Sequence, residues 1–189
     1  MAKRSASVEE TRRRIVEATI ELHTSQGILA TSWEEIARRA DVAPATVYRH
    51  FPTLDELLPA CGELGRRRLA LPSDEEIAKR FRSPRSRRER LRRLVEEVFG
   101  LYERGGDVLR AIRRERAVLA PLQQDYERIE ERLDALTAAA LAPLELGEHE
   151  VAVVRALTDY DAWGALRERG ITGSDAIDVA AGLLEGWLR

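Results

Sequence analysis

Signals for helix starts recur along the chain and constrain its fold more than any other feature of the sequence. Five expected helix starts each carry a Ser or Thr that precedes a Glu by three residues: Ser7 with Glu10, Ser32 with Glu35, Thr53 with Glu56, Ser73 with Glu76, and Ser86 with Glu89. In such a capping box the hydroxyl accepts a hydrogen bond from a free N–H of the first helical turn, and the glutamate accepts one from the capping residue. Five such signals, each beside apolar residues at helical spacing, predict a chain built from helices.

Composition and periodicity extend this prediction to an all-α fold. Ala, Leu, Arg and Glu, which favour helices, are abundant, whereas aromatic residues make up only 5% of the chain. The predicted helices span about residues 8–26, 33–40 and 44–50, a fourth helix that starts at 54 and includes 64, and then 74–82, 87–104, 107–119, 122–142, 148–169 and 173–188. Glycines at 105 and 106 separate the sixth helix from the seventh.

The length and residue usage bound the class of protein. A chain of 189 residues accommodates a small module and a larger core, and we place the boundary between residues 1–53 and residues 54–189. Cys61 is the only cysteine, which excludes an intrachain disulfide and a cysteine-based metal cage. The longest apolar run, residues 138–142, is far too short for a membrane-spanning helix. We expect a soluble, cytoplasmic protein without a membrane partner.

The first 52 residues have the pattern of a helix-turn-helix module. Three short helices are predicted there, and a tight turn at residues 41–43 joins the second to the third. In such modules the third helix enters the major groove of DNA. Helical spacing turns Val47 and Phe51 inward and leaves Thr46, Tyr48, Arg49 and His50 on the outer surface.

In these residues the chain resembles the TetR family of bacterial transcriptional regulators. The similar stretch runs over residues 12–58, and its most specific part is Thr-Val-Tyr-Arg-His-Phe-Pro at residues 46–52. The resemblance implies that residues 1–53 bind a palindromic operator, and that residues 54–189 form a helical bundle for ligand binding and dimerisation. It further implies a ligand-responsive repressor, acting as a homodimer on double-stranded DNA and released by a small-molecule effector.

The resemblance also assigns DNA-contacting residues. Pro44, Ala45, Thr46 and Arg49 are expected near base edges, while Ser32, Tyr48 and His50 are expected to hold phosphates. The chemistry agrees, since arginine offers a fork of donors to guanine and hydroxyls donate to phosphate oxygens. Alternatively, Tyr48 is a half-buried core aromatic and His50 caps the helix end.

The charge of this module gives only limited support to the prediction that it binds DNA. The whole chain has a formal net charge of −2, and the module itself is near neutral. Two positions that are often basic in the family hold Glu34 and Leu54 here. Residues 1–14 carry five basic side chains (Lys3, Arg4, Arg12, Arg13 and Arg14), so a flexible basic arm on DNA and a solvated tail are both open interpretations. A second basic stretch, residues 66–93, is expected to form solvated helix faces and ion pairs.

The larger domain offers candidate sensing and assembly residues. Aromatic residues beside helical glycines, with two polar neighbours, suggest a ligand pocket or else an ordinary core: Phe99, Tyr102, Tyr126, Asp159 and Trp163. The apolar face of the last helix predicts a two-fold dimer interface containing Val179, Leu183, Gly186 and Trp187. Pro59, Gly62 and Gly65 fall inside the predicted fourth helix, where we expect a kink or soft joint.

Two other classes of function remain open at this stage. A small helical enzyme would draw on His23, His50 and His149, but these lie in separate elements without metal-ligand spacing. No phosphate-binding glycine loop or nucleophile motif is present, so we expect no catalytic residue, no metal site and no cofactor. The second alternative is a helical regulator with weakened DNA binding that acts through protein contacts.

Overall fold

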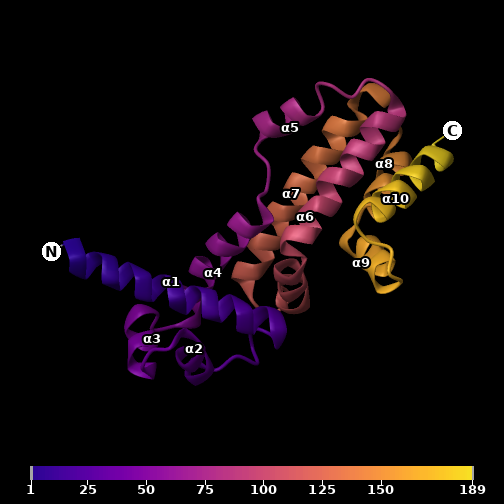
Figure 1. The fold of residues 1–189 in the computed structure, drawn as a ribbon. Coiled ribbons are helices and arrows are strands. Elements are labelled where there is room, and N and C mark those ends of the chain that lie inside the picture. The colour runs from indigo at the N-terminus through magenta and orange to yellow at the C-terminus, as the bar shows by residue number, and fades with distance from the viewer. Residues whose placement is uncertain (1, 189) are drawn as a thin grey trace. The chain divides into compact units, whose positions relative to one another are not determined.

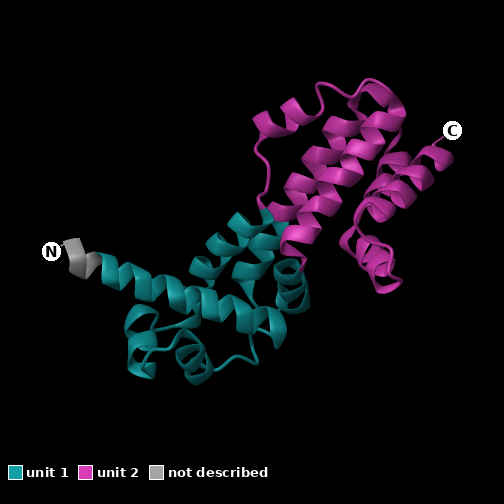
Figure 2. Cartoon of the chain, in the orientation of Figure 1, with its two compact units in different colours: residues 1–69, 107–127 teal, residues 70–106, 128–189 magenta. Residues whose placement is uncertain are grey.

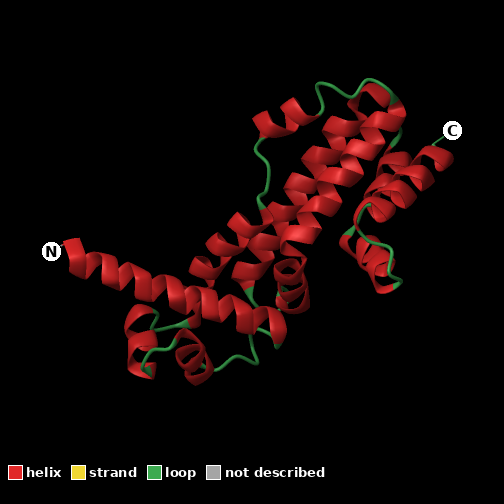
Figure 3. Cartoon of the chain, viewed as in Figure 1, coloured by secondary structure: helices red, strands yellow, loops and turns green. Residues whose placement is uncertain are grey.

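The computed structural model describes the backbone of residues 2–188 and the side chains of residues 6–188, and this part of the chain contains helices without strands (Figure 3). The elements, labelled in Figure 1, are α1 (Ala2–Ser25), α2 (Trp33–Ala40), α3 (Pro44–His50), α4 (Leu54–Leu69), α5 (Asp74–Arg80), α6 (Arg87–Glu115), α7 (Ala120–Leu141), the 3-10 turn η1 (Ala142–Leu144), α8 (Glu148–Leu157), α9 (Tyr160–Glu168) and α10 (Gly173–Trp187). The predicted all-α fold is confirmed.

The chain packs into two compact units (Figure 2). Unit 1 contains the residues up to 69 together with 107–127, and unit 2 contains 70–106 together with the residues from 128 onward. Each of the long helices α6 and α7 therefore contributes one part to each unit. The expected boundary after residue 53 separates a DNA-binding domain from a ligand-binding domain, and it stays a prediction. The compact units divide the chain differently, because α4 belongs to the same unit as α1, α2 and α3.

Three of the five predicted capping boxes are present. The hydroxyls of Ser32, Ser73 and Ser86 accept from the backbone N–H three residues later, at 3.2–3.3 Å. The paired glutamates accept from the backbone N–H of the capping serines, at 2.7–3.2 Å. These backbone hydrogen bonds lower the pKa of Glu35 and of Glu76.

The other two predicted caps differ from expectation. Ser7 lies inside α1, because the helix-favouring residues before it let the helix begin at Ala2. The Ser7 carbonyl accepts from the hydroxyl of Thr11 at 2.9 Å, so this serine belongs to the helix interior. Thr53 has only the hydroxyl-to-Glu56 contact, at 3.4 Å.

One of two further predicted helix boundaries needs revision. The single helix expected over residues 148–169 is two helices, α8 and α9. The Thr158 hydroxyl donates to the Val154 carbonyl at 2.9 Å, and the extended backbone of Asp159 (φ −70°, ψ 164°) starts α9. The break expected at residues 105–106 is confirmed, because Gly105 has non-helical backbone angles (φ −145°, ψ 21°) and α6 consists of two helical segments that meet at a kink there.

The glycines of α4 have a packing role. A Cβ atom on Gly62 would lie 2.5 Å from the Oδ2 of Asp125 in α7, and one on Gly65 would lie 3.1 Å from Val108 in α6. Both neighbours belong to unit 1. The two glycines therefore allow α6 and α7 to pack closely against α4. The helix α4 continues through Pro59, and the soft joint expected there remains a prediction.

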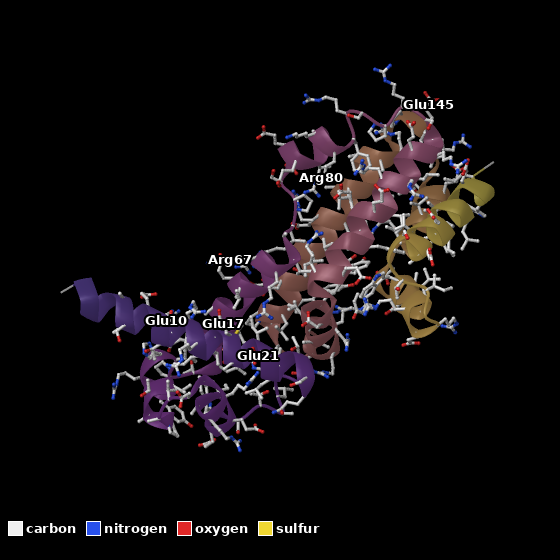
Figure 4. The ribbon with its side chains drawn as sticks, in the orientation of Figure 1. Glu10, Glu17, Glu21, Arg67, Arg80 and Glu145 are labelled. Carbon is white, nitrogen blue, oxygen red and sulfur yellow. The ribbon has the colours of Figure 1, made fainter. Side chains whose placement is uncertain are left out.

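The basic stretch over residues 66–93 is mostly paired within the protein, as expected. Its ion pairs within single units join Arg66 to Asp125 and Glu63, Arg67 to Glu63, Arg80 to Glu97, Arg88 to Glu185, Arg92 to Glu96 and Asp178, and Arg93 to Glu96 and Glu97. Arg67 and Arg80 are labelled in Figure 4. These pairs favour the interpretation of this stretch as helix faces over a second nucleic-acid site.

Arg90 is a buried arginine that holds helix ends together in unit 2. Only 8% of its surface is exposed. Its guanidinium donates to the carbonyls of Ala139 and Ala140, at the end of α7, at 2.5 and 2.7 Å. It also donates to the carbonyls of Phe81 and Pro84, at 3.1 and 2.9 Å. One side chain therefore satisfies carbonyls that the helices themselves leave free.

We expect Arg90→Met to lower the free energy of unfolding by about 3 kcal/mol, because buried carbonyls lose their donor. Urea unfolding followed by circular dichroism measures this change. Arg88→Met is the matched control, since Arg88 is exposed and its ion pair is 3.8 Å long; its effect should stay below about 0.5 kcal/mol. Equal effects of the two substitutions would contradict the role of Arg90.

Candidate nucleic-acid interface

The connection between α2 and α3 is a tight turn with defined backbone geometry. Asp41 follows α2 in the left-handed conformation (φ 53°, ψ 55°), which aspartate tolerates better than most residues. The N–H of Val42 then bonds to the carbonyl of Ala37 at 3.0 Å. Ala43 is extended, and Pro44 occupies the first turn of α3, where its missing N–H costs nothing. The predicted helix-turn-helix is confirmed.

The two faces of α3 separate as the spacing predicts. Val47 is 0% exposed and Phe51 is 1% exposed, and these buried side chains pack α3 against the rest of unit 1. On the other face Pro44, Ala45, Tyr48 and Arg49 are exposed, and Thr46 and His50 are half-buried. Six of the seven predicted DNA-contacting residues thus share one short helix, and the seventh, Ser32, begins α2.

Arg49 is the residue of this face best suited to contact a base. Its guanidinium makes no hydrogen bond or ion pair with any residue that the structure describes, and it projects from the exposed side of α3. The planar fork of donors matches the O6 and N7 acceptors of guanine in the major groove. The site therefore holds an unused bidentate donor at the position where a recognition helix needs one.

Tyr48 has features of both roles considered for it from the sequence, an exposed phosphate contact and a half-buried core aromatic. Its side chain is 43% exposed, yet its ring packs against Trp33 of α2 with centroids 5.3 Å apart. Sequence analysis did not single out Trp33, although an aromatic residue directly after the helix cap was a usable signal. The pair holds the Tyr48 ring in place at the edge of α3.

The Ser32 hydroxyl is already engaged in its cap. It accepts from the N–H of Glu35 and donates to the Glu35 carboxylate at 2.8 Å. Glu34 and Glu35 place negative charge in the same first turn, which weakens the attraction of the α2 N-terminus for a phosphate. A phosphate contact of Ser32 requires the hydroxyl to turn away from Glu35.

Three of the five basic residues of the possible N-terminal arm lie in a helix. Arg12, Arg13 and Arg14 lie on α1 and are used inside the protein. Arg12 stacks over the Phe51 ring at 4.3 Å. Arg13 pairs with Glu10 and with Glu17, the latter at 2.6 Å, and both glutamates are labelled on α1 in Figure 4. Arg14 donates to the carbonyls of Ala40 and of Asp41, the latter at 2.8 Å. The side chains of Lys3 and Arg4 lie outside the described residues.

Arg14 thereby caps the end of α2 beside the turn. A cation at this position satisfies free carbonyls and complements the negative end of the helix dipole. It is 27 residues from Asp41 in sequence, so no local pattern indicated the contact. The residue counted as a candidate DNA contact is instead a support of the helix-turn-helix geometry.

A second support, which we call the Glu115 clamp, holds the segment before α2. The Glu115 carboxylate accepts from the backbone N–H of Ile28 at 3.1 Å and of Leu29 at 2.9 Å, while Arg114 donates to the carbonyl of His23 at 3.2 Å. Gly27 is needed here: its φ is 114°, and a Cβ atom would lie 2.7 Å from the Glu115 carboxylate. The end of α6 therefore sets the path of the chain into α2.

The residues expected to form a ligand pocket are only partly brought together. In unit 2, Tyr102 packs against Phe99 and Trp163 with ring centroids 6.5 and 5.6 Å apart. Asp159 precedes α9 as its N-cap. Tyr126 belongs to unit 1, where Arg116 stacks over its ring at 4.2 Å. These aromatic rings fill space against one another, as the alternative of an ordinary core predicts.

The predicted dimer residues lie on the accessible side of α10. Val179, Leu183 and Trp187 are 40%, 58% and 43% exposed, although all three are large and apolar, and Gly186 is exposed between them. The opposite side of α10 carries the buried residues Ala176, Ala180 and Leu184. The helix thus has one face packed within unit 2 and a second apolar face in contact with solvent.

The helix-turn-helix is the architecture of a DNA-binding module. The sequence model described as bacterial regulatory proteins, tetR family, matches residues 15–61. The transcriptional repressor KstR of Rhodococcus jostii is 27% identical over 96% of this chain and 86% of its own length. The N-terminal module therefore matches the TetR family of bacterial transcriptional regulators, and a repressor is similar over most of the chain.

Solved structures share the fold. A transcriptional regulator from Rhodococcus sp. Rha1 has a TM-score of 0.65 at 18% identity, covering 94% of this chain and 95% of its own. The multidrug binding protein EbrR, complexed with imidazole, has a TM-score of 0.59 at 22% identity, covering 92% and 87%. KstR is a repressor and the Rhodococcus sp. Rha1 protein is a transcriptional regulator, so neither is an enzyme. Among the described helices, none has the length and apolarity needed to cross a membrane.

His23, beside the Glu115 clamp, titrates outside its usual range. It is 5% exposed, and burial lowers its pKa from 6.5 to about 4, although Glu115 acts in the opposite direction. The side chain is therefore neutral at pH 7 in the folded protein. In the unfolded chain it binds a proton near pH 6.5, so acidification favours unfolding.

We expect the unaltered protein to lose up to about 3 kcal/mol of unfolding free energy, relative to a His23→Gln variant, as the pH falls from 7 to about 4. Urea unfolding of both proteins across this pH range gives the difference between their unfolding free energies. The carboxylates are the same in both proteins, so their titration cancels in this difference. His149→Gln, which alters an exposed histidine, should track the unaltered protein. A pH-independent difference for His23→Gln would refute the assignment.

Proposed function

We propose that the chain is a dimeric repressor whose two α3 helices read the half-sites of a palindromic operator. The exposed, unengaged Arg49 carries this proposal, with Pro44, Ala45 and Thr46 near base edges and Ser32, Tyr48 and His50 at phosphates. In this scheme residues 1–53 bind DNA and residues 54–189 sense and assemble. KstR, named a repressor, supports repression as the mode of action.

Assembly through α10 follows from the apolar face described above. A two-fold contact through Val179, Leu183, Gly186 and Trp187 would remove this face from water and pair two recognition helices. Pairing adds the binding energy of two half-sites, which compensates for the near-neutral charge of each module. The alternative of a regulator acting only through protein contacts leaves Arg49 without a role.

We also propose that a small-molecule effector releases the DNA and that the protein works in the cytoplasm. EbrR, titled a multidrug binding protein, supports an effector for this fold. Phe99, Tyr102, Asp159 and Trp163 remain the candidate contacts in unit 2, and Tyr126 the candidate in unit 1. Because the unit 2 rings pack on one another, an effector there has to separate them.

The DNA proposal is tested by selecting bound fragments from the genome of the source bacterium and footprinting them. We expect a protected palindrome, and Arg49→Ala to weaken binding about 10- to 100-fold and relax one position in each half-site. Arg169→Ala, which removes an exposed arginine from the end of α9, is the matched control and should bind normally. Selection of no fragment, or equal affinities of the two variants, would overturn the proposal.

The dimer proposal predicts that Leu183→Glu yields a monomer, because a buried unpaired carboxylate opposes association. Light scattering at micromolar concentration distinguishes the two states. Val118→Glu places the same charge at a residue that is 67% exposed outside α10 and should remain dimeric. A monomeric unaltered protein, or a dimeric Leu183→Glu variant, would argue against this interface.

A further inference from the structure

The loop between α5 and α6 in unit 2 is rich in arginine and is fixed in shape (Figure 1). We call this loop, residues 81–86, the arginine loop. The buried Arg90 side chain donates to two carbonyls of the loop, at 3.1 and 2.9 Å. The Glu89 carboxylate accepts from the backbone N–H of Arg85 at 2.9 Å. The loop is therefore held by side chains of α6, and it presents its cations on a preorganised surface, which lowers the entropy cost of binding.

Three cations at this loop have no partner in the described part of the chain. Lys79 near the end of α5, Arg82 and Arg85 are exposed, and their side chains make no hydrogen bond or ion pair with a described residue. Glu76 interacts electrostatically with Lys79, and Glu89 with Arg85, but both carboxylates are engaged in capping boxes. The arginines at the start of α6, by contrast, all have partners within the protein.

An open groove of about 410 Å³, which we call the basic groove, lies between α5, the arginine loop and α6. Three of its five lining residues are cations, and the full set is Glu76, Lys79, Arg80, Ser83 and Arg93. Arg80, labelled in Figure 4, and Arg93 share the Glu97 carboxylate, at 2.6 and 3.8 Å. The Ser83 hydroxyl makes no hydrogen bond with a described residue. The groove therefore offers Lys79 and Ser83 as unused donors beside two further cations.

We propose that the arginine loop and the basic groove bind an acidic segment of a partner protein. One carboxylate of the segment enters the groove and accepts from Lys79 and Ser83, while further carboxylates pair with Arg82 and Arg85. The planar fork of an arginine matches a carboxylate, and clusters of arginine are a recurrent means of binding acidic peptides. This interaction goes beyond the proposed DNA binding and does not depend on it.

The charges around this surface favour a short acidic peptide over a nucleic acid. Asp74, Glu75 and Glu76 occupy the first turn of α5 and limit the positive surface at that end. A nucleic-acid backbone is a continuous row of phosphates that would extend toward these carboxylates, whereas a peptide of a few residues ends before them. The Phe81 ring is 6% exposed, so it is not available to stack on bases.

A membrane surface is disfavoured by the lack of apolar anchors. Among the described residues, none of the large apolar side chains that are exposed lies within residues 70–93. Peripheral membrane binding normally combines basic residues with inserted apolar side chains. Charge complementarity without an apolar contact instead suits a polar, acidic partner segment.

The probe is a fluorescein-labelled octapeptide of glutamate, titrated with the full-length protein at low salt while fluorescence anisotropy is followed. We expect a saturable rise, with half-saturation in the micromolar range, that disappears as salt screens the charges. A variant with Lys79→Gln, Arg82→Gln and Arg85→Gln should weaken binding about 10-fold, a factor of about two for each exposed ion pair. These side chains have no partner, so the variant should keep its circular dichroism spectrum and melting temperature.

A charge-matched control separates this surface from the net charge of the protein. A variant with Arg38→Gln, Arg67→Gln and Arg169→Gln also removes three positive charges, from exposed arginines outside the arginine loop and the basic groove. It should bind the peptide as the unaltered protein does. Equal losses in the two triple variants, or no saturable binding by the unaltered protein, would overturn the proposal.

Other polyanions test the choice of partner. Duplex DNA of unrelated sequence and vesicles of phosphatidylglycerol are titrated with the unaltered protein and with the variant altered at residues 79, 82 and 85. Neither affinity should fall as much as the peptide affinity, and binding to the DNA selected above should be unchanged. A larger loss for DNA or for vesicles than for the peptide would assign this surface to that polyanion and overturn the proposal. If the protein selects no operator, the proposed function fails while the peptide titration still decides this inference.

Discussion

The burial of Val47 and Phe51 is the constraint on which the DNA-binding surface depends. These two side chains, 0% and 1% exposed, fix the rotation of α3 about its axis. Because they are four residues apart, the opposite face is defined as well, and Arg49 must project from it. The stacking of Arg12 on Phe51 adds a contact from α1 to the same anchor. A helix of only seven residues has little stability alone, so its position comes from this packing.

Charged side chains at helix ends complete the positioning. Arg14 satisfies the carbonyls at the end of α2, Glu115 captures two N–H groups before α2, and Arg90 joins the ends of α5 and α7 to α6 in unit 2. Each contact satisfies backbone groups that a helix leaves free. Arginine and glutamate side chains on an exposed helix surface would contribute little to stability. The backbone groups that these side chains contact therefore determine their structural role.

Local patterns predicted much of the fold and of the DNA-facing surface. The caps at Ser32, Ser73 and Ser86, the turn at Asp41 and the two faces of α3 all follow from short-range chemistry. Errors arose where a local signal competed with another one. Ser7 is a valid cap residue, but helix-favouring neighbours extend α1 past it. At Thr158 α8 ends without any glycine or proline to indicate the break.

The sequence by itself determined the helical class, the helix-turn-helix and the outward position of Arg49, because periodicity and capping act within a few residues. Tertiary structure decided which arginines remain available. Arg12, Arg13 and Arg14 resemble DNA contacts in sequence, yet their partners Phe51, Glu17 and Asp41 occupy them. The Glu115 clamp, whose carboxylate is 86 residues from Leu29, likewise exists only once distant helices pack. A side chain's role depends on its neighbours, and packing alone specifies those that are distant in sequence.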